Sequence, residues 1–266
     1  GTANKLVREQ LSGIVATALA ELRKEILVQT TLVAPITDVT LARPRALAFY
    51  DEEIMVGSAH TSRAILVKLT SGTTREVGTP NPITNAYAVD KTVWWQLGTG
   101  IAPVDALGAA GELFGQVENA SDYVIFNQGL YVLRPDEEQI IRYSARSATF
   151  SGSGQPWIKK QTVLPLDARF LAIDGDLYVV SVNGSVQKLR RGMAIPFNLT
   201  PIDPDMTNVT DVWTSEKTSF IYLLDAESAR LVVFTKEGKL RAQYRTDVLK
   251  TATSFLVDEK KKKVYV

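Results

Sequence analysis

A repeated pattern is the feature that most constrains the fold of this chain of 266 residues. Each copy has an apolar pair, a turn containing Asp, Asn or Glu, and then an apolar or aromatic run, as in "AVDKTVWW", "IFNQGLYV" and "AIDGDLYVV". The turn residues that mark the copies are Asp51, Asp90, Asn127, Asp174, Glu216 and Asp258. Their mean spacing is (258 − 51)/5, about 41 residues. Repeats of this length each build one structural unit, so the sequence predicts six similar units.

Each copy has room for four strands. After the first two strands come a polar break, a third alternating strand such as "RLVVFTK", a turn with Gly, and a fourth strand such as "KLRAQY". Short strands at regular spacing with turn signals indicate an all-β protein, and four strands per period of about 40 residues are typical of a propeller blade. We therefore expect an all-β fold, a six-bladed β-propeller of four-stranded antiparallel blades.

One stretch carries a family resemblance. "FIYLLDAESARLVVFTKEGKLRAQY", from Phe220 to Tyr244, resembles the repeat of the NHL and YVTN class of six-bladed propellers. Asp225, Arg230, Phe234 and Gly238 stand at positions typical of that repeat. The second copy, with "LGTGIAPVDALGAAG", departs most from the pattern. The resemblance spans roughly residues 36–266 and implies the architecture rather than an activity.

The two ends of the chain bear on how the ring closes. The last copy has only two strands, so other strands must complete it if the ring is to avoid an open edge. We expect Leu32 to Thr40 to do this, with "ILVQT" as a candidate second strand, so that residues 1–31 form a helix and linker and residues 32–266 the propeller. Residues 4–24 show helical periodicity. This helix either docks on the propeller, is part of a linker, or binds a partner or a second copy.

Composition argues against several classes of function and of binding site. Thirty Lys and Arg against 29 Asp and Glu provide no general attraction to nucleic acid, and the lack of Cys excludes disulfides and thiolate metal sites. No apolar run is long enough to span a bilayer. The chain begins "GTANK", without an initiator Met, so we expect either a fragment of a longer bacterial signalling protein or a processed or engineered chain. The lysines of "VDEKKKKVYV" fall at a predicted turn, residues 259–263, which is either a solvated turn or a basic docking patch.

No catalytic residues are predicted. His60 is the only histidine and lies in a predicted loop, so neither a catalytic triad nor a zinc site can be assembled around it. Three of the four tryptophans lie in predicted strands, where large rings fill the space between blades. Trp157 lies in a loop and is a candidate exposed anchor. With Arg134 and Asp136 it makes up the predicted set of surface-loop contacts for a partner.

A candidate binding site emerges when the copies are aligned. First strands line the central channel of a propeller, so equivalent positions form a ring. Five residues before each marker stand Ala46, Asn85, Asp122, Arg169, Asp211 and Thr253. This level is polar apart from Ala46, whereas the level two residues further along is almost wholly apolar. The polar ring is either a wetted channel mouth or a site for a ligand or cation, and we expect Arg169 to pair with its carboxylates.

Two functions fit these features. The first is a non-catalytic binding or sensor module for a protein or small ligand, without a cofactor, because such propellers resemble sensor domains of bacterial signalling proteins. That resemblance slightly favours an extracytoplasmic location. The alternative is a calcium-dependent lactonase-like hydrolase, since similar six-bladed enzymes hold calcium at the channel mouth. Only Asn85, Asp122 and Asp211 could serve as its ligands.

Overall fold

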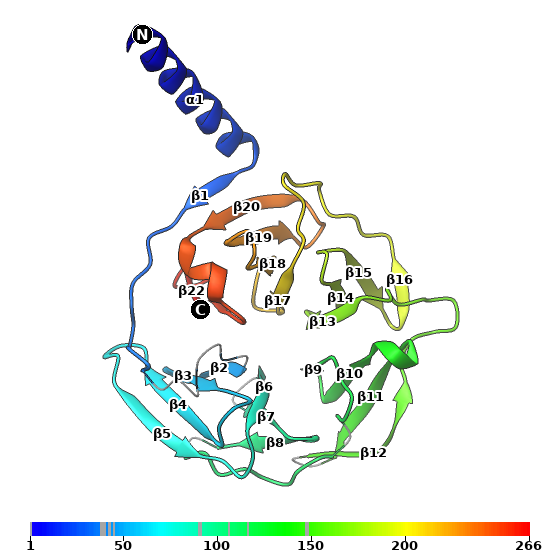
Figure 1. The fold of residues 1–266 in the computed structure, drawn as a ribbon. Coiled ribbons are helices and arrows are strands. Elements are labelled where there is room, and N and C mark those ends of the chain that lie inside the picture. Colours follow the sequence, from blue (N-terminus) through cyan, green and yellow to red (C-terminus); the bar gives the residue numbers. More distant parts are fainter. Residues whose placement is uncertain are drawn as a thin grey trace.

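The computed structural model of the chain describes residues 2–37, 41, 44, 46–89, 92–105, 107–115, 117–146 and 149–266. These residues form one long helix and a ring of β-sheets around a central axis (Figure 1). Within blades 1 to 4 the first strand in chain order lies nearest the axis and the later strands lie progressively further out, and β17 to β20 follow the same order in blade 5 (Figure 1). The predicted all-β propeller with a helix at the N-terminus is confirmed.

Three of the sheets have the expected four antiparallel strands. Blade 1 consists of β2 (Ala46–Tyr50), β3 (Glu53–Gly57), β4 (Arg63–Lys68) and β5 (Thr74–Gly78). Blade 3 consists of β9 (Asp122–Phe126), β10 (Gly129–Arg134), β11 (Gln139–Arg146) and β12 (Thr149–Pro156). Blade 4 consists of β13 (Ala168–Ile173), β14 (Leu177–Ser181), β15 (Val186–Arg190) and β16 (Met193–Ile195). Short 3-10 helices at Pro135–Glu137 and Asp247–Thr251 complete the described elements.

Blade 2, the poorest copy in sequence, is also the least regular of the five larger sheets. It has three strands, β6 (Ile83–Val89), β7 (Thr92–Leu97) and β8 (Gly100–Val104). Isolated bridges join β8 to the following segment, from Ile101 to Phe114 and from Val104 to Ala110. The stretch "LGTGIAPVDALGAAG" therefore supplies one strand and two single bridges instead of two strands.

Blade 5 is larger than expected. It contains β17 (Val209–Trp213), β18 (Phe220–Asp225), β19 (Arg230–Thr235) and β20 (Leu240–Arg245), and β1 (Glu25–Leu27) adds a fifth strand to its outer edge. The β1–β20 pair is parallel, with Ile26 opposite Tyr244. This is the one parallel pair among the described strands, and it departs from the expected purely antiparallel sheets.

The predicted number of six blades is wrong. Among the described residues, five sheets have three or more strands, and the sixth copy forms a two-stranded hairpin of β21 (Leu256–Asp258) and β22 (Lys263–Tyr265). Its turn occupies residues 259–262, so the lysines lie in and beside a turn, as predicted.

Residues 28–37, which we call the strap, cross from blade 5 to blade 1. Val28 donates its backbone N–H to the Arg245 carbonyl at 3.1 Å, and a Cβ atom at Gly72 would overlap the carbonyl oxygen of Val33. Residues 32–37 form no strand, and residues 38–40 lie outside the described residues. The N-terminal strand that does form joins blade 5 instead of the hairpin, so closure of the last blade by Leu32 to Thr40 stays a prediction.

The cores lie between neighbouring blades. Tyr178 and Val180 of blade 4 pack with Ile221 and Val232 of blade 5 in one buried cluster. Middle strands are therefore covered on both faces, which explains why β18, "FIYLLD", reads as a continuous apolar run instead of an alternating one. Full burial of each such side chain contributes about 1.5–3 kcal/mol. Packing between blades thus fixes the first strands around the axis.

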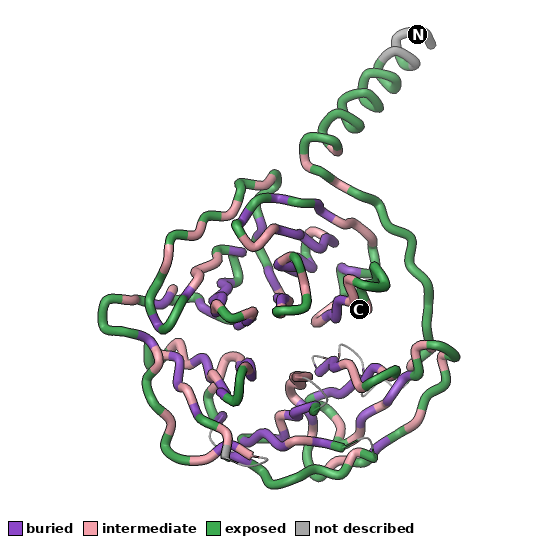
Figure 2. Tube along the Cα trace, turned by 180° about the vertical axis from the view of Figure 1, so that it is seen from behind, coloured by how far each residue is buried: buried purple, intermediate pink, exposed green. Residues whose placement is uncertain are grey.

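Helix α1 (Thr2–Leu22) projects away from the ring (Figure 1). Most of its described residues are exposed, and so is most of the strap (Figure 2). Leu11, Ile14 and Val15 are 57%, 65% and 56% exposed. The helix meets the ring at its C-terminal end only, which contradicts docking of its apolar face on the propeller.

Candidate functional site

The predicted ring residues lie where expected, at the starts of the first strands. Asp122 begins β9, Asn85 and Asp211 lie within β6 and β17, and Thr253 comes shortly before β21. All four are half-buried. Their side chains bond to one another and to the backbone of neighbouring blades.

Asp122 connects three blades. Its Oδ1 accepts one hydrogen bond from Asn85 Nδ2 of blade 2, at 3.0 Å, and another from the Tyr123 N–H, at 2.8 Å. Its Oδ2 accepts from the Leu171 N–H of blade 4 at 2.8 Å. One carboxylate thus joins blades 2, 3 and 4 beside the axis.

Asp211 has the same role on the other side of the ring. Its Oδ1 accepts from the Val212 N–H at 2.8 Å. Its Oδ2 accepts from Ser254 Oγ at 2.7 Å and from the Phe255 N–H at 3.1 Å, both next to the hairpin. Thr253 then donates its hydroxyl to the Pro44 carbonyl at 2.5 Å, ahead of blade 1. These bonds extend the connections from blade 5 to the start of blade 1.

The carboxyl groups also act on each other through charge. Burial is the main cause that raises the pKa of Asp122 to about 7, and repulsion from Asp211 raises it further. The hydrogen bonds from Leu171, Tyr123 and Asn85 oppose this increase because they favour the ionised form. Burial and the nearby charge of Asp211 therefore both favour the neutral form of the Asp122 carboxyl group.

Arg169 does not take the predicted place. Its side chain is exposed, and among the described residues it forms no salt bridge with Asp122 or Asp211. The register of β13 and β14 shifts between Ala168 and Phe170, so Arg169 lies at a β-bulge without a cross-strand partner. A bulge redirects a side chain, which makes the expected salt bridge wrong.

The surface-loop residues are only partly available for a partner. Trp157 is half-buried, and its ring contacts Tyr131 edge-on with the centroids 5.4 Å apart. Arg134 donates to Glu137 at 2.9 Å across the β10–β11 turn, whereas Asp136 is exposed. Trp157 thus packs against blade 3 and is not the exposed anchor that the sequence suggested. His60 is exposed in its loop, as expected.

Two further groups were not found as parts of a site by sequence reasoning. Glu259 follows β21 and accepts from the backbone N–H groups of Ser219 and Phe220 and from the Tyr222 hydroxyl, so it fastens the hairpin to blade 5. Ser254 bonds to Asp211, as described above. Glu259 stands in the lysine run and Ser254 between strands, and neither position has a motif that would have revealed its role.

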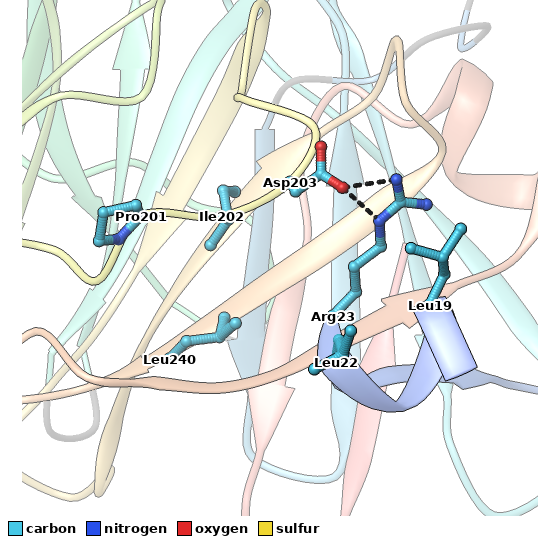
Figure 3. A pocket seen from close by; sticks show the side chains of 7 residues that line it. All are labelled: Leu19, Leu22, Arg23, Pro201, Ile202, Asp203 and Leu240. Atoms are coloured by element: carbon cyan, nitrogen blue, oxygen red, sulfur yellow. Dashed lines mark hydrogen bonds and ion pairs between the residues drawn. The ribbon is translucent and has the colours of Figure 1, made fainter. Parts of the chain in front are cut away.

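The described surface has a shallow hollow where α1 meets blade 5. Its volume is about 340 Å³. Leu19, Leu22 and Arg23 lie on one side and Pro201, Ile202, Asp203 and Leu240 on the other (Figure 3). Arg23 donates to Asp203 at 2.5 and 2.7 Å, and Gln243 Nε2 donates to the Arg23 carbonyl at 2.8 Å. These contacts fix the end of the helix to the ring.

The part of the chain that the structure describes contains neither a side-chain cluster that could hold a metal ion nor a helix that could span a membrane. No three His, Cys, Asp or Glu side chains among these residues gather closely enough to hold a metal ion. The structure brings Asn85 to Asp122, two of the three predicted metal ligands. Among the described helices, none is both long and apolar enough to span a bilayer.

Comparison with known proteins supports the fold. No protein-family model matches the sequence, and no curated protein sequence is similar to it. A solved structure of the nidogen/laminin complex is similar with a TM-score of 0.58 and 13% identity, over 85% of this chain and 84% of that chain. Regucalcin from Agrobacterium tumefaciens, described as a calcium-binding protein, has a TM-score of 0.56 and 10% identity, over 84% and 80%. A catalytically inactive virginiamycin B lyase from Staphylococcus aureus, solved with quinupristin, has a TM-score of 0.54 and 11% identity, over 79% and 72%. At these identities the likeness shows that the chain has the β-propeller fold.

Proposed function

We propose that this protein is a non-catalytic binding or sensor module, whose ring is a rigid support for contacts made at its outer surface. The main support for this proposal is the hydrogen bonding of the two ring carboxylates. Asp122 and Asp211 both accept from backbone N–H groups of a neighbouring blade or hairpin, at 2.8 and 3.1 Å. Because these oxygens already join the blades, they favour a structural role beside the axis and leave recognition to the exterior.

The partner is a protein or a small molecule, and not nucleic acid. The nearly balanced charge of the chain supports this, since phosphate backbones attract strongly basic surfaces. The projecting helix α1 supports a protein partner, because Leu11 and Ile14 expose apolar side chains on it. Asp136 and Arg134 on blade 3 are secondary candidates for contacts.

We also propose a bacterial, extracytoplasmic setting, on the resemblance to propellers that serve as sensor domains. Fractionation of cells that carry the tagged native gene tests this proposal. Recovery of the tagged protein in the cytoplasmic fraction alone would contradict it.

A calcium-dependent hydrolase similar to lactonases is the second candidate. The observation in its favour is the mutual repulsion of Asp122 and Asp211 near the axis, which a bound cation would relieve. Asn85 could then add an amide oxygen. Calcium would supply a Lewis acid that polarises a carbonyl group. In the hydrolase, the same ring residues would bind a metal ion, and they would not serve mainly to join the blades.

Thermal melts with calcium or with a chelator distinguish the two functions. For the binding module we expect the midpoint to stay within about 1 °C between the two conditions, and no hydrolysis of simple lactones. Asp136→Asn is the matched control, because Asp136 is an exposed carboxylate away from the ring. A midpoint that rises with millimolar calcium in the wild type but not in Asp211→Asn, together with lactone hydrolysis, would establish the hydrolase instead.

A further inference from the structure

The direction of helix α1 depends on a short joint between the helix and blade 5. Among the described residues of α1, no side chain forms a hydrogen bond or salt bridge with the ring, and Leu11 and Ile14 are more than half exposed. Lys24 has a φ of 51°, in the left-handed region, and turns the chain from the helix into β1. Ile26 and Leu27 of β1 are 44% and 87% exposed, so burial contributes little to the joint. Its geometry therefore depends on polar contacts.

Arg23 is the residue at which the joint meets blade 5. Its side chain donates to Asp203 at 2.5 and 2.7 Å (Figure 3). Its backbone carbonyl accepts a hydrogen bond from Gln243 Nε2 at 2.8 Å. Asp203 belongs to the loop that enters blade 5, whereas Gln243 lies in the strand β20. Arg23 thus contacts two separate segments of the ring.

A buried arginine connects those two segments to each other. Arg230 donates to Gln243 Oε1 at 2.7 Å, and to the carbonyls of residues 204 and 205 at 2.7 and 2.9 Å. Arg230 and Gln243 are both 0% exposed, so these bonds form without competition from water. The bonds close a cycle that runs from Arg23 through the loop to Arg230, and through Gln243 back to Arg23.

The loop in this cycle is open to solvent. Pro201 and residues 203–205 are exposed, whereas Arg230 holds the loop from inside the blade. Hydrogen bonds in a network strengthen one another, so the loss of one bond weakens the others. A displacement of the loop therefore weakens the contacts that hold the end of the helix on blade 5.

We propose that this cycle, which we call the helix clamp, fixes the direction of α1 against blade 5 and transmits a displacement of residues 201–205 to the helix. With the helix clamp closed, α1 has one direction relative to the ring. When a partner displaces the loop, β1 separates from β20 and the helix is released, while β17–β20 stay paired. This inference rests on the proposed sensor function and gives it a route from the ring surface to α1.

Spin labels test whether the helix clamp sets the direction of α1. The chain has no Cys, so Ser12→Cys on α1 and Lys160→Cys after β12 provide two labelled, exposed positions. Pulsed electron paramagnetic resonance measures the distribution of distances between them. We expect a narrow distribution without further changes, and one at least about twofold broader with Asp203→Ala or Gln243→Leu, because a joint that opens locally samples several arrangements.

Two matched control variants should leave this distribution unchanged. Asp136→Ala removes an exposed aspartate from blade 3. Gln187→Leu removes a glutamine that donates to the Val163 carbonyl at 2.9 Å, a bond of the same kind in blade 4. Asp203→Ala alters an exposed side chain, so it keeps the test decisive if Gln243→Leu does not fold.

Amide exchange tests whether the bonds act as one cycle. The N–H group of Val28 bonds to the Arg245 carbonyl, so its exchange reports opening of the joint. Asp203→Ala and Gln243→Leu should each accelerate this exchange by about fivefold, and the double variant by less than about tenfold, whereas independent effects would give about 25-fold.

Coupling between two sites is reciprocal, so a change at the helix must also act on the loop. Arg23→Ala should therefore accelerate exchange of the Thr200 N–H, which bonds to the Gly238 carbonyl at 2.7 Å, by about threefold. This bond does not involve Arg23, so the effect reports transmission through the loop.

Three results would overturn the proposal: a distance distribution in Asp203→Ala as narrow as in the control variants, independent effects in the double variant, or unchanged exchange of Thr200 in Arg23→Ala. Equal acceleration of exchange in β18 and β19 would show that blade 5 opens together with the joint, and would also overturn it. No partner is present in these measurements. Failure of the helix clamp is therefore distinguishable from failure of the proposed binding function.

Discussion

Blade 5 and the hairpin β21–β22 are neighbours in the ring, but different contacts hold them in place. Blade 5 has five strands and encloses Arg230, which is 0% exposed and donates to Asp225 at 2.9 Å and to Gln243 at 2.7 Å. The hairpin has two short strands. Phe255 and Val257 pack against blade 5, and carboxylates of Asp211 and Glu259 accept backbone hydrogen bonds across the same junction. The comparison teaches that contacts with neighbouring blades can hold a two-stranded hairpin in its place in the ring.

The largest expected effect is in blade 5. Arg230→Met leaves the carboxylate of Asp225 buried without its cationic partner, and breaking a buried ion pair in this way costs about 3–5 kcal/mol. Arg230 also donates to the carbonyls of Pro204 and Asp205, at 2.7 and 2.9 Å, which the substitution leaves unpaired. Urea unfolding should therefore show a loss of about this size.

Two variants sharpen this test. Arg190→Met removes an arginine that is 59% exposed and paired with Asp176, so it should cost less than about 1 kcal/mol. The double variant Asp225→Leu and Arg230→Met should recover part of the loss, because it removes both buried charges. If Arg230→Met unfolds like the wild type, blade 5 does not depend on its buried ion pair.

Blade 5 was also the region that sequence described best. Asp225, Arg230 and Gly238 matched a known repeat because a buried ion pair and a tight turn need particular residues at particular positions. The hairpin was placed by the repeat, but its contacts with other blades, and the place of β1, have no such requirement. They depend on contacts between distant segments, such as Tyr265 with Phe49 at 5.8 Å and Ile26 opposite Tyr244, which no local pattern reveals.

The ring beside the axis was predictable in position and only partly in detail. Period and turn markers placed Asn85, Asp122 and Asp211 at equivalent levels, and the structure gives two of them equivalent bonds to the next blade or hairpin. The prediction for Arg169 was wrong because Arg169 itself occupies a β-bulge, the position that Thr84 and Thr210 take in β6 and β17. Counting back from a turn cannot detect which residue lies in the bulge. Similarly, the incomplete second blade was visible as a weak repeat, but its missing strand was not.

The second expected effect concerns the two ring carboxylates that accept hydrogen bonds from a neighbouring blade or hairpin. Asp122 lies among larger sheets, whereas Asp211 lies beside the hairpin. The folded pKa of Asp122, about 7, lies above its ordinary value of 3.8. A raised carboxyl pKa gives stability that is full below the unfolded pKa and is lost as the pH rises through the folded pKa. Asp122 should therefore lower the free energy of unfolding between about pH 4 and pH 7, by up to about 1.4 kcal/mol per pH unit for one proton.

Urea unfolding of the wild type and of Asp122→Asn, from pH 5 to pH 8, measures this effect as the difference between their slopes. Asp176 does not interfere, because its hydrogen bond from Arg190 lowers its pKa and moves its titration below this window. Asp122→Asn should be less dependent on pH than the wild type. If Asp211→Asn removes the pH dependence of the free energy of unfolding and Asp122→Asn does not, the carboxyl group that titrates is Asp211, beside the hairpin.

The smallest expected effect is local to the hairpin and tests whether it depends on its neighbour. Glu259→Ala removes the acceptor for the N–H groups of Ser219 and Phe220, at 2.8 and 3.2 Å, and for the Tyr222 hydroxyl at 2.8 Å. Bonds to a charged acceptor at a half-buried site contribute about 1–2 kcal/mol in total, so amide exchange in β21 and β22 should accelerate by roughly tenfold. Exchange in β18 and β19 should change far less, because blade 5 keeps its own strands and its buried ion pair when the hairpin opens. Lys261→Ala is the matched control, since it removes only the Lys261–Asp258 pair, in which the lysine is 61% exposed, and it should leave both regions within about threefold of the wild type. Equal acceleration in the hairpin and in blade 5 would mean that the two regions open as one cooperative unit, and the distinction between a self-sufficient blade and a hairpin held by its neighbours would then be wrong.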